Sequence, residues 1–250
     1  RHTSSHCDWS SDVCSSDRQA LTLAVDRYSA SKYLSNIAIV KTVGGIVFPG
    51  HPLAASQAEM EQLIGYSKDI EASRAKARQL LKDAGVPEGF KFIFNNRGVD
   101  QPYKVVGTWL VDQWRKVGLD PQQTVKPSPQ FYATLRKKYD FDVSIDFNCQ
   151  SVINPIADVS KFLCSAGNNY SQCDNQEIED LYDRLMKAAT LDEQKAAMRA
   201  YEKAAVDFAG SSITLWWYKI NPHRSYVKGW NIAPSHYLNQ IGRASCRERV

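Results

Sequence analysis

Apolar residues recur at helical spacing in two stretches of the first third of the chain. Residues 18–26 (RQALTLAVD) and residues 70–84 each place apolar side chains along one helical face. Asp69 is a suitable N-cap for the second helix, and Gly85 is typical of a residue just past its end. Between the two, residues 43–51 (VGGIVFPGH) are rich in Gly and Pro and predict an irregular loop.

The centre of the chain alternates between short apolar runs and amphipathic segments. We expect strands at residues 90–94, 119–125 and 141–147, and helices at residues 103–117 and 130–138. Strands and helices that alternate at this spacing are typical of parallel strands joined by helical crossovers. The pattern therefore predicts an α/β fold with a partly parallel β-sheet flanked by helices.

Two later helices are predicted by their start signals. The pairs Asp174/Glu177 and Thr190/Glu193 both fit the capping-box spacing, in which the side chains at each end satisfy backbone donors. The apolar positions that follow are Ile178, Leu181, Tyr182, Leu185 and Met186 in the first helix, and Ala197, Met198, Tyr201, Ala205 and Phe208 in the second. Residues 213–220 (ITLWWYKI) then form a β-type apolar run.

The two ends of the chain carry no such periodicity. Residues 1–17 are rich in Ser and residues 241–250 are rich in Arg, and both segments resemble translated adapter or vector sequence. We therefore expect both to be non-native flanks of residues 18–240. Because the pattern at residue 18 begins inside a helix, the native part is expected to be a fragment.

Composition narrows the class of protein. Apolar residues make up 43% of the chain and charged residues 23%, which is enough apolar surface for a folded core. The 31 Lys and Arg against 27 Asp and Glu give a net charge of +4, without the basic stripe that nucleic-acid binding needs. The sequence contains no run of about 18 apolar residues, the length that would predict a transmembrane helix. We expect a globular protein with no nucleic-acid partner.

Sequence motifs of catalysis and cofactor binding are missing. The chain has no G-x-S-x-G, no phosphate-binding loop, no G-x-G-x-x-G, no H-E-x-x-H and no C-x-x-C. His51, His223 and His236 are far apart in sequence and are more typical of hydrogen-bonding histidines than of a metal site. We expect no metal, no cofactor and no catalysis. An α/β hydrolase or transferase that uses Asp146 with a histidine is kept as an alternative.

Three cysteines belong to residues 18–240. Cys164 and Cys173 lie nine positions apart in a polar loop, CSAGNNYSQC. A disulfide between them stabilises the fold by roughly 2–3 kcal/mol in the chain-entropy model and indicates an oxidising compartment. Cys149 is then either buried and free, or it is the true partner of one of the other two.

Hydrogen-bonding side chains gather after the third predicted strand, in residues 146–154 (DFNCQSVIN). In open α/β sheets, ligands bind beyond the carboxyl ends of parallel strands, and residues 95–97 leave the first predicted strand at the same edge. Trp216 and Tyr218 share one face of the last apolar run and offer flat rings to a ligand, although core packing explains these aromatics equally well. The candidate ligand-binding residues are Asn96, Arg97, Asp146, Asn148, Gln150, Ser151, Asn154, Trp216 and Tyr218.

Six stretches, in order, resemble the C-terminal half of the solute-binding proteins of ABC importers, family 5, the dipeptide-, oligopeptide- and nickel-binding class. They are RQALTLAVDR (18–27), VGGIVFPGHPLA (43–54), ASRAKARQLLKDAGVPEGF (72–90), GTWLVDQWRKVGL (107–119), NQEIEDLYDRLMKA (175–188) and ITLWWYKINPHRSYVKGW (213–230). The resemblance implies a type II periplasmic binding protein with two lobes and roughly twice this length. Residues 18–240 would supply its C-terminal lobe.

The same resemblance implies a function. The complete protein would be a monomer that captures a small-molecule solute between its lobes and delivers it to an ABC transporter permease in the membrane. It would work in the periplasm, or on the cell surface with a lipid anchor. A periplasmic chaperone or sensor built on the same fold stays open as an alternative.

One position departs from the peptide-binding members of the family. Those relatives carry a W-C-A-D-Y type segment, whose Asp pairs with the amino terminus of the peptide. Aligned on Cys149, the carboxylate position is Ser151, and Asp146, five residues earlier, substitutes for it only if the loop differs. A neutral hydroxyl does not offset an ammonium charge in a poorly solvated cleft. We therefore expect a neutral or anionic solute instead of an ordinary peptide.

Overall fold

Helices and strands alternate through most of the chain in the computed structural model, which describes residues 15–38, 40–138, 141–150, 154–171, 173–217 and 224–227. The helices are α1 (Ser15–Leu23), α2 (Arg27–Ile37), α3 (Gln57–Met60), α4 (Ile70–Asp83), α5 (Val105–Arg115), α6 (Ser128–Ala133), α7 (Pro155–Asp158), α8 (Gln176–Lys187) and α9 (Leu191–Phe208). Shorter helical turns are η2 (Asp100–Lys104), η3 (Thr134–Lys138) and η4 (Val159–Phe162). The strands are β1 (Val40–Thr42), β2 (Phe90–Arg97), β3 (Leu119–Lys126), β4 (Val143–Ser144) and β5 (Trp216–Trp217).

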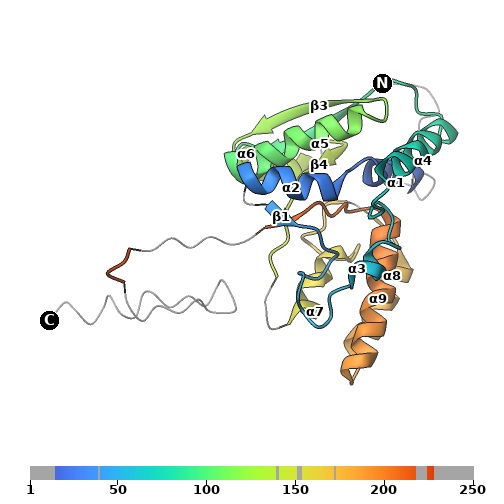
Figure 1. The fold of residues 1–250 in the computed structure, drawn as a ribbon, viewed down its shortest axis with the longest axis vertical. Helices are drawn as coiled ribbons and strands as arrows, with labels where there is room; N and C mark the ends of the chain where they lie inside the picture. The colour runs from blue at the N-terminus through green and yellow to red at the C-terminus, as the bar shows by residue number, and fades with distance from the viewer. Residues whose placement is uncertain are drawn as a thin grey trace.

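The larger sheet has three parallel strands in the order β3-β2-β4. Helix α5 leads from β2 back to β3, so this pair of strands has the helical crossover that parallel pairing requires. A second, two-stranded sheet pairs β1 with β5 in antiparallel orientation and brings residue 217 beside residue 40. Figure 1 shows the three-stranded sheet together with α5 in the upper part of the molecule and α8 and α9 below it. The predicted α/β class with a parallel sheet is confirmed.

Two of the predicted strand lengths are wrong. Strand β2 extends to Arg97 instead of ending at Phe94, because its pairing with β3 continues to the end of both strands. Strand β4 has two residues where the pattern predicted 141–147, since two residues of β2 pair with it. Residues 95–97 therefore lie within a strand and do not leave it.

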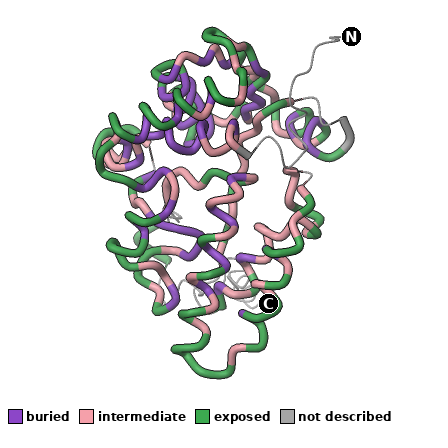
Figure 2. The backbone as a smooth tube through the Cα atoms, turned by 90° about the vertical axis from the view of Figure 1, so that its right-hand side faces the viewer, coloured by how far each residue is buried: buried purple, intermediate pink, exposed green. Residues whose placement is uncertain are grey.

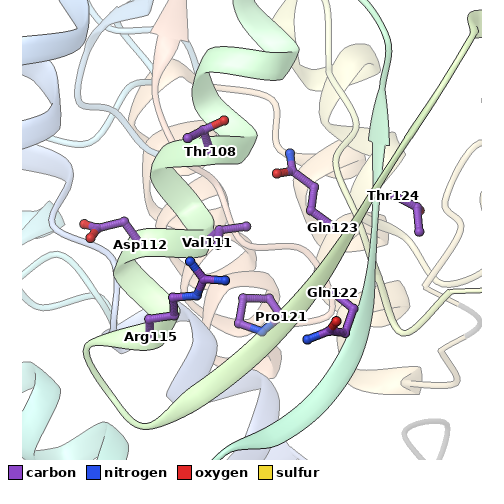
Figure 3. Close-up of a pocket in the computed structure, with 8 residues that line it drawn as sticks. All are labelled: Thr108, Val111, Asp112, Arg115, Pro121, Gln122, Gln123 and Thr124. Carbon is purple, nitrogen blue, oxygen red and sulfur yellow. The ribbon is translucent and has the colours of Figure 1, made fainter.

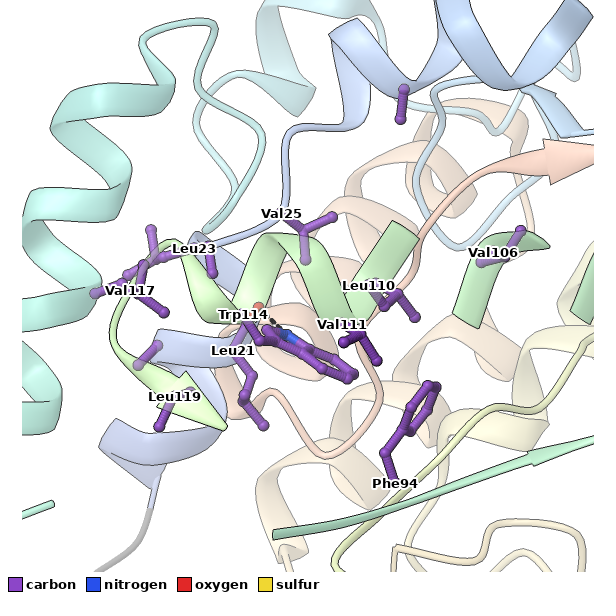
Figure 4. Packing of buried hydrophobic residues seen from close by; sticks show 14 of the residues in the cluster. Leu21, Leu23, Val25, Phe94, Val106, Leu110, Val111, Trp114, Val117 and Leu119 are labelled. Atoms are coloured by element: carbon purple, nitrogen blue, oxygen red, sulfur yellow. Dashed lines mark hydrogen bonds between the residues drawn. The ribbon is translucent and has the colours of Figure 1, made fainter. Parts of the chain in front are cut away.

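Buried residues of α1, α2, β1, α4, β2, α5 and β3 form one hydrophobic cluster, here called the sheet core. Phe92 and Phe94 of β2 meet the Trp114 ring of α5 edge-on, with ring centroids 5.6 and 5.1 Å apart. The Trp114 indole N–H donates to the backbone oxygen of Leu21 at 3.2 Å, which ties α5 to α1 (Figure 4). Edge-to-face aromatic pairs are worth about 0.5–1.5 kcal/mol beyond their buried area.

A second hydrophobic cluster, here called the hairpin core, lies between the α8–α9 helix pair and the irregular chain of residues 46–66. Its largest buried side chains are Tyr66, Tyr201, Ile46, Ile178, Leu185 and Met198. Figure 2 shows buried positions along the inside of both the upper and the lower part of the molecule, with exposed positions around them. The described chain therefore has two cores, one organised by a sheet and one by a helix pair.

The predicted helix ends are mostly right. Asp69 caps α4 by accepting from the Ala72 N–H at 3.0 Å, and Thr190 forms the predicted capping box at the start of α9. The start of α8 is a correction. Its N-cap is Asn175 instead of Asp174, because the Asn175 side chain accepts from the backbone N–H three residues later. Met186 is 57% exposed, so the predicted apolar face of α8 is too wide.

Several predictions lie outside the described residues. Ser151, Tyr218, His223, His236 and the flank 241–250 belong to this group. The proposed boundaries after residue 17 and after residue 240 stay predictions. Within the described chain, every helix is too short or too polar to cross a membrane.

Candidate functional site

Charged and aromatic side chains meet beyond the carboxyl end of β2, where the sheet core faces the hairpin core. We call them the strand-end site: Arg97, Tyr103, Tyr132, Arg136, Asp146, Lys161 and Tyr170. The first six come from β2, η2, α6, η3, the segment after β4, and η4. Tyr170 belongs to the polar loop before α8. This is the edge of an α/β sheet at which ligands bind.

Arg97, the last residue of β2, is held from several sides. Its Nε donates to the Ser128 hydroxyl at 2.8 Å, and its Nη1 donates to the Tyr103 hydroxyl at 3.3 Å. The guanidinium also lies over the rings of Tyr103 and Tyr132, 5.0 and 5.3 Å from their centroids. Burial raises the pKa of Tyr103 to about 12 although Arg97 acts in the opposite direction, so Tyr103 stays protonated at neutral pH. The result is a guanidinium that is held against two tyrosine rings.

Asp146 already has a cationic partner. The Lys161 ammonium lies 2.5 Å from Asp146 Oδ2 and also donates to the backbone oxygen of Phe147. The side chain of Asp146 is 24% exposed and that of Lys161 is 17% exposed, so water screens this pair less than an ion pair on the open surface. An ammonium group of a solute would have to compete with Lys161 for the carboxylate. Asp146 is therefore poorly placed to replace the carboxylate missing at position 151.

Arg136 supplies a second guanidinium on the same side of the molecule. Its Nε donates to the Tyr170 hydroxyl at 3.4 Å, and its guanidinium carbon lies 5.3 Å from the centroid of the Tyr132 ring. Together with Arg97 and Lys161, it gives the site three cations against the one carboxylate of Asp146. Among the described residues, the strand-end site thus has an excess of positive charge, which favours neutral or negatively charged groups.

Asn96, predicted to line the site, lies in the core beneath it. Its side chain is fully buried, donates to the backbone oxygen of Tyr103 at 3.0 Å and accepts from the Arg97 N–H at 2.8 Å. A Cβ on Gly107 of α5 would lie 2.0 Å from the Asn96 amide nitrogen, so the helix packs directly onto this side chain. The structure gives Asn96 a packing role.

The other predicted amides bond to the protein backbone. Gln150 accepts from the Phe48 N–H at 3.0 Å and donates to the Ile46 oxygen, which attaches the irregular chain to the segment after β4. Asn148 donates to a backbone oxygen at the end of α7 at 3.4 Å. Asn154 is the N-cap of α7 and accepts from the N–H two residues later at 3.2 Å. These three side chains order the chain around the strand-end site.

The tryptophans of β5 pack on opposite sides, as the alternation of a strand predicts. The Trp216 indole N–H donates to the Gly45 oxygen at 3.0 Å, and a Cβ on Gly44 would come within 2.8 Å of the Trp216 ring. Trp217 instead meets the Tyr103 and Phe147 rings, with centroids 5.8 and 6.4 Å apart. The rings therefore contact the protein itself, in agreement with the core-packing interpretation.

The cysteines and His51 were also singled out in the sequence. Cys164 and Cys173 form the predicted disulfide. The alternative that pairs Cys149 with one of these two cysteines is wrong, because they pair with each other. Cys149 lies outside this bridge, as the other alternative predicted, but it is exposed instead of buried. His51 accepts from the Leu53 N–H at 3.1 Å, and burial lowers its pKa. Within the described part of the chain, no three His, Cys, Asp or Glu residues gather as metal ligands would.

A hollow of about 640 Å³ lies elsewhere, between α5 and the edge strand β3 (Figure 3). Its lining residues are Thr108, Val111, Asp112, Arg115, Pro121, Gln122, Gln123 and Thr124. It shares no residue with the strand-end site. Its charged side chains pair locally, since Asp112 lies 2.7 Å from the Lys116 ammonium and Arg115 lies 3.9 Å from Asp120.

Five members of the strand-end site were missed by the sequence interpretation: Tyr103, Tyr132, Arg136, Lys161 and Tyr170. They come from the short helix α6, from helical turns and from a loop, where no periodic pattern marks them. A signal for two of them was present, since Arg136 and Lys161 are basic residues close to the third predicted strand. Nothing in their spacing showed that they would face Tyr170 and Asp146.

Comparisons with known proteins agree with the fold. Residues 16–170 match the family described as bacterial extracellular solute-binding proteins, family 5 Middle. A dipeptide-binding protein of Escherichia coli (strain K12) is 25% identical over 239 residues, which are 90% of this chain and 42% of that protein. This chain thus spans less than half the length of the curated relative that it matches.

Solved structures share the fold at low identity. The murein tripeptide binding protein MppA of Escherichia coli, in its unliganded open form, superposes with a TM-score of 0.71 at 16% identity, over 81% of this chain and 39% of that one. AgaA from A. tumefaciens R10, in complex with agropinic acid, gives a TM-score of 0.64 at 21% identity, over 81% and 40%. The family match covers more than half of the chain, which therefore belongs to the bacterial extracellular solute-binding proteins, family 5.

Proposed function

We propose that this chain forms the C-terminal lobe of a two-lobed protein that captures a solute outside the cytoplasm for an ABC importer. The family match carries this proposal, and the position of the strand-end site at the carboxyl edge of the parallel sheet supports it. The solute would bind between this lobe and a first lobe, and closure would be favoured by contacts that both lobes make with it. The chain itself would do no chemistry.

The proposal includes a partner and a location. The loaded protein would hand its solute to a permease in the membrane. It would act in the periplasm, or outside the cell with a lipid anchor. The Cys164–Cys173 disulfide supports an oxidising compartment.

An enzyme built on Asp146 and a histidine is not favoured. Asp146 pairs with Lys161, whereas His51 bonds to Leu53 and meets the Phe48 ring, with centroids 5.1 Å apart. A chaperone or sensor on the same fold would differ in its partner, and no contact of the described residues favours it.

We further propose that the solute is neutral or anionic. The occupied carboxylate of Asp146 supports this, as do the three cations around it. Among similar solved structures, AgaA was solved with agropinic acid and DppA from Helicobacter pylori with the peptide STSA, so ligands of more than one chemical class occur on this fold.

The first experiment is to read the native locus outward through both ends of residues 18–240. We expect upstream coding sequence for a first lobe with an export signal. If no first lobe is encoded, the proposal of capture between two lobes is overturned.

The second experiment tests the charge of the solute on the complete protein by thermal shift. Three probes isolate the charged groups: dialanine carries both, N-acetyl-dialanine carries the carboxylate, and dialanine amide carries the ammonium. A neutral monosaccharide is added as a fourth probe. We expect N-acetyl-dialanine or the sugar to raise Tm more than dialanine amide does. The reverse order would contradict a neutral or anionic solute.

A matched pair of variants sharpens this result. Lys161→Met releases the Asp146 carboxylate and is expected to shift the preference toward dialanine amide. Lys187→Met, on an exposed position of α8, is expected to leave the preference unchanged.

A further inference from the structure

The loop closed by the Cys164–Cys173 disulfide has an ordered interior. Asn169 donates through its Nδ2 to the backbone oxygen of Leu163 at 2.8 Å. Its Oδ1 accepts from both the backbone N–H and the hydroxyl of Ser171, at 3.0 and 2.7 Å. One amide side chain thus fixes the backbone on both sides of residue 170. The loop presents Tyr170 from a defined position.

Tyr170 reaches from this loop to the opposite side of the strand-end site. Its hydroxyl accepts from Arg136 Nε at 3.4 Å, and Arg136 belongs to η3, which follows α6 beside the sheet. The Arg136 side chain is exposed and its guanidinium lies over Tyr132, so the Tyr170 hydroxyl and the Tyr132 ring are two contacts that orient it. The loop and the sheet side are 34 residues apart in sequence at this contact.

We propose that Tyr170 is a positioning residue of the strand-end site, held in place by the Cys164–Cys173 disulfide, and that it sets how available the Arg136 guanidinium is to a negatively charged group. The disulfide shortens the range over which the loop can move, and Asn169 aligns its backbone. The hydroxyl occupies one N–H of the guanidinium and leaves the others for an oxyanion such as a carboxylate. This proposal deepens the proposed function and rests on it for its biological meaning.

Labelling with phenylglyoxal tests the contact on the 250-residue chain itself. The reagent modifies arginine guanidinium groups, and peptide mass spectrometry gives a rate for each arginine separately. The chain is compared with Tyr170→Phe, which removes the hydroxyl and keeps the ring, and with the double variant C164S/C173S, which removes the bridge. Arg115 is the internal control, because its side chain is 61% exposed and lies outside the strand-end site.

We expect Arg136 to be labelled roughly two- to tenfold faster in both variants, the range that corresponds to losing one hydrogen bond of ordinary net strength, since this contact is long and exposed. The rate at Arg115 stays constant. An unchanged rate at Arg136 in Tyr170→Phe overturns the proposal, as does an equal rise at Arg115, which would indicate general loosening. A rise in Tyr170→Phe without a rise in the double variant overturns the role of the disulfide.

Two features keep the test decisive. Tyr170→Phe retains both cysteines, so the contact is tested whether or not the double variant folds. The labelling needs no solute, so its result is separate from the thermal shift of the complete protein. The absence of an encoded first lobe together with a positive labelling result would reject the proposed function and leave the positioning of Arg136 by Tyr170 in place.

Discussion

The sheet core and the hairpin core hold their backbone in different ways. In the sheet core, the parallel ladder and the helices pair the backbone groups, and side chains such as Phe92 fill the space between them. In the hairpin core, the irregular chain depends on buried side chains instead. Glu202 Oε1 accepts from the Ile46 N–H at 2.8 Å, and the Tyr66 hydroxyl donates to the Gly44 oxygen at 2.9 Å. Buried backbone without a ladder needs partners of this kind.

Arg27 extends the same arrangement to the border between the two cores. Arg27 is 1% exposed, and its guanidinium donates to the backbone oxygens of Gly65 and Ile213, each at 2.7 Å, and to the Ser212 hydroxyl at 3.2 Å. It also lies 4.7 Å from the centroid of the Tyr66 ring. A single buried cation therefore ties α2 to two irregular segments. If this comparison is right, disturbing the buried polar side chains near the hairpin core lowers the free energy of unfolding more than replacing an apolar side chain in the sheet core.

The largest effect is expected for Arg27→Met. The substitution removes the donors to the buried Gly65 oxygen and the half-buried Ile213 oxygen, and leaving a buried acceptor unpaired costs about 1–3 kcal/mol. We expect the free energy of unfolding to fall by about 3 kcal/mol or more in urea denaturation. Arg78→Met, on α4 with its hydrogen bond at the surface, is the control and should change little. Equal effects of the two substitutions would remove the special role of the buried guanidinium.

Gly45→Ala is expected to cause the next largest loss of stability. A Cβ at Gly45 would lie 1.8 Å from Glu202 Oε1, and the buried carboxylate is held by Ile46 and cannot move away freely. Forcing extra volume into a packed site costs about 1–3 kcal/mol. Gly167→Ala is the matched control, because a Cβ there would meet nothing within 4 Å. Thermal unfolding of both variants checks this, and a stable Gly45→Ala variant would show that the contact between Glu202 and Ile46 has room to adjust.

A substitution in the sheet core is expected to cost less stability than the two substitutions above. Phe92→Leu keeps most of the apolar volume and loses the edge-on contact with Trp114, so we expect a cost of about 1.5 kcal/mol or less. The loss should not depend on pH, because no ionisable group is involved. Urea denaturation at two pH values measures both points. A cost larger than that of Gly45→Ala would reverse the order of the two cores.

The same contrast explains what the sequence could predict. The caps at Asp69 and Thr190 were found because each signal lies within four residues of its partner. The short length of β4 was not found, since it depends on pairing with a strand about fifty residues earlier. At the site, Asp146 was identified but its partner Lys161 was not, because a contact over 15 residues through a helical turn leaves no periodic pattern. Glu202 and Ile46 are 156 residues apart, which is beyond any local signal.

The smallest effect is expected at the buried carboxylate of Glu202. It is a change in how the free energy of unfolding depends on pH. Burial raises the pKa of Glu202 above the ordinary value of 4.5, and nearby Glu59 adds to the shift, while Arg199 and the Ile46 N–H oppose it. The folded state therefore binds a proton at Glu202 more tightly than the unfolded state does. The stability from this group is fully present below about pH 4.5 and is lost as the pH rises through the higher folded pKa.

Glu202→Gln keeps an oxygen that can accept from Ile46 but does not titrate. We expect the free energy of unfolding of the parent chain to decline between pH 4.5 and 7 relative to this variant, by at most about 1.4 kcal/mol per pH unit for one proton. Urea denaturation of both proteins across that range gives the difference. Parallel profiles would mean that the Arg199 guanidinium fully offsets the burial of the carboxylate. The hairpin core would then hold its irregular chain with a balanced ion pair, and its electrostatics would resemble those of Asp146 and Lys161 at the strand-end site.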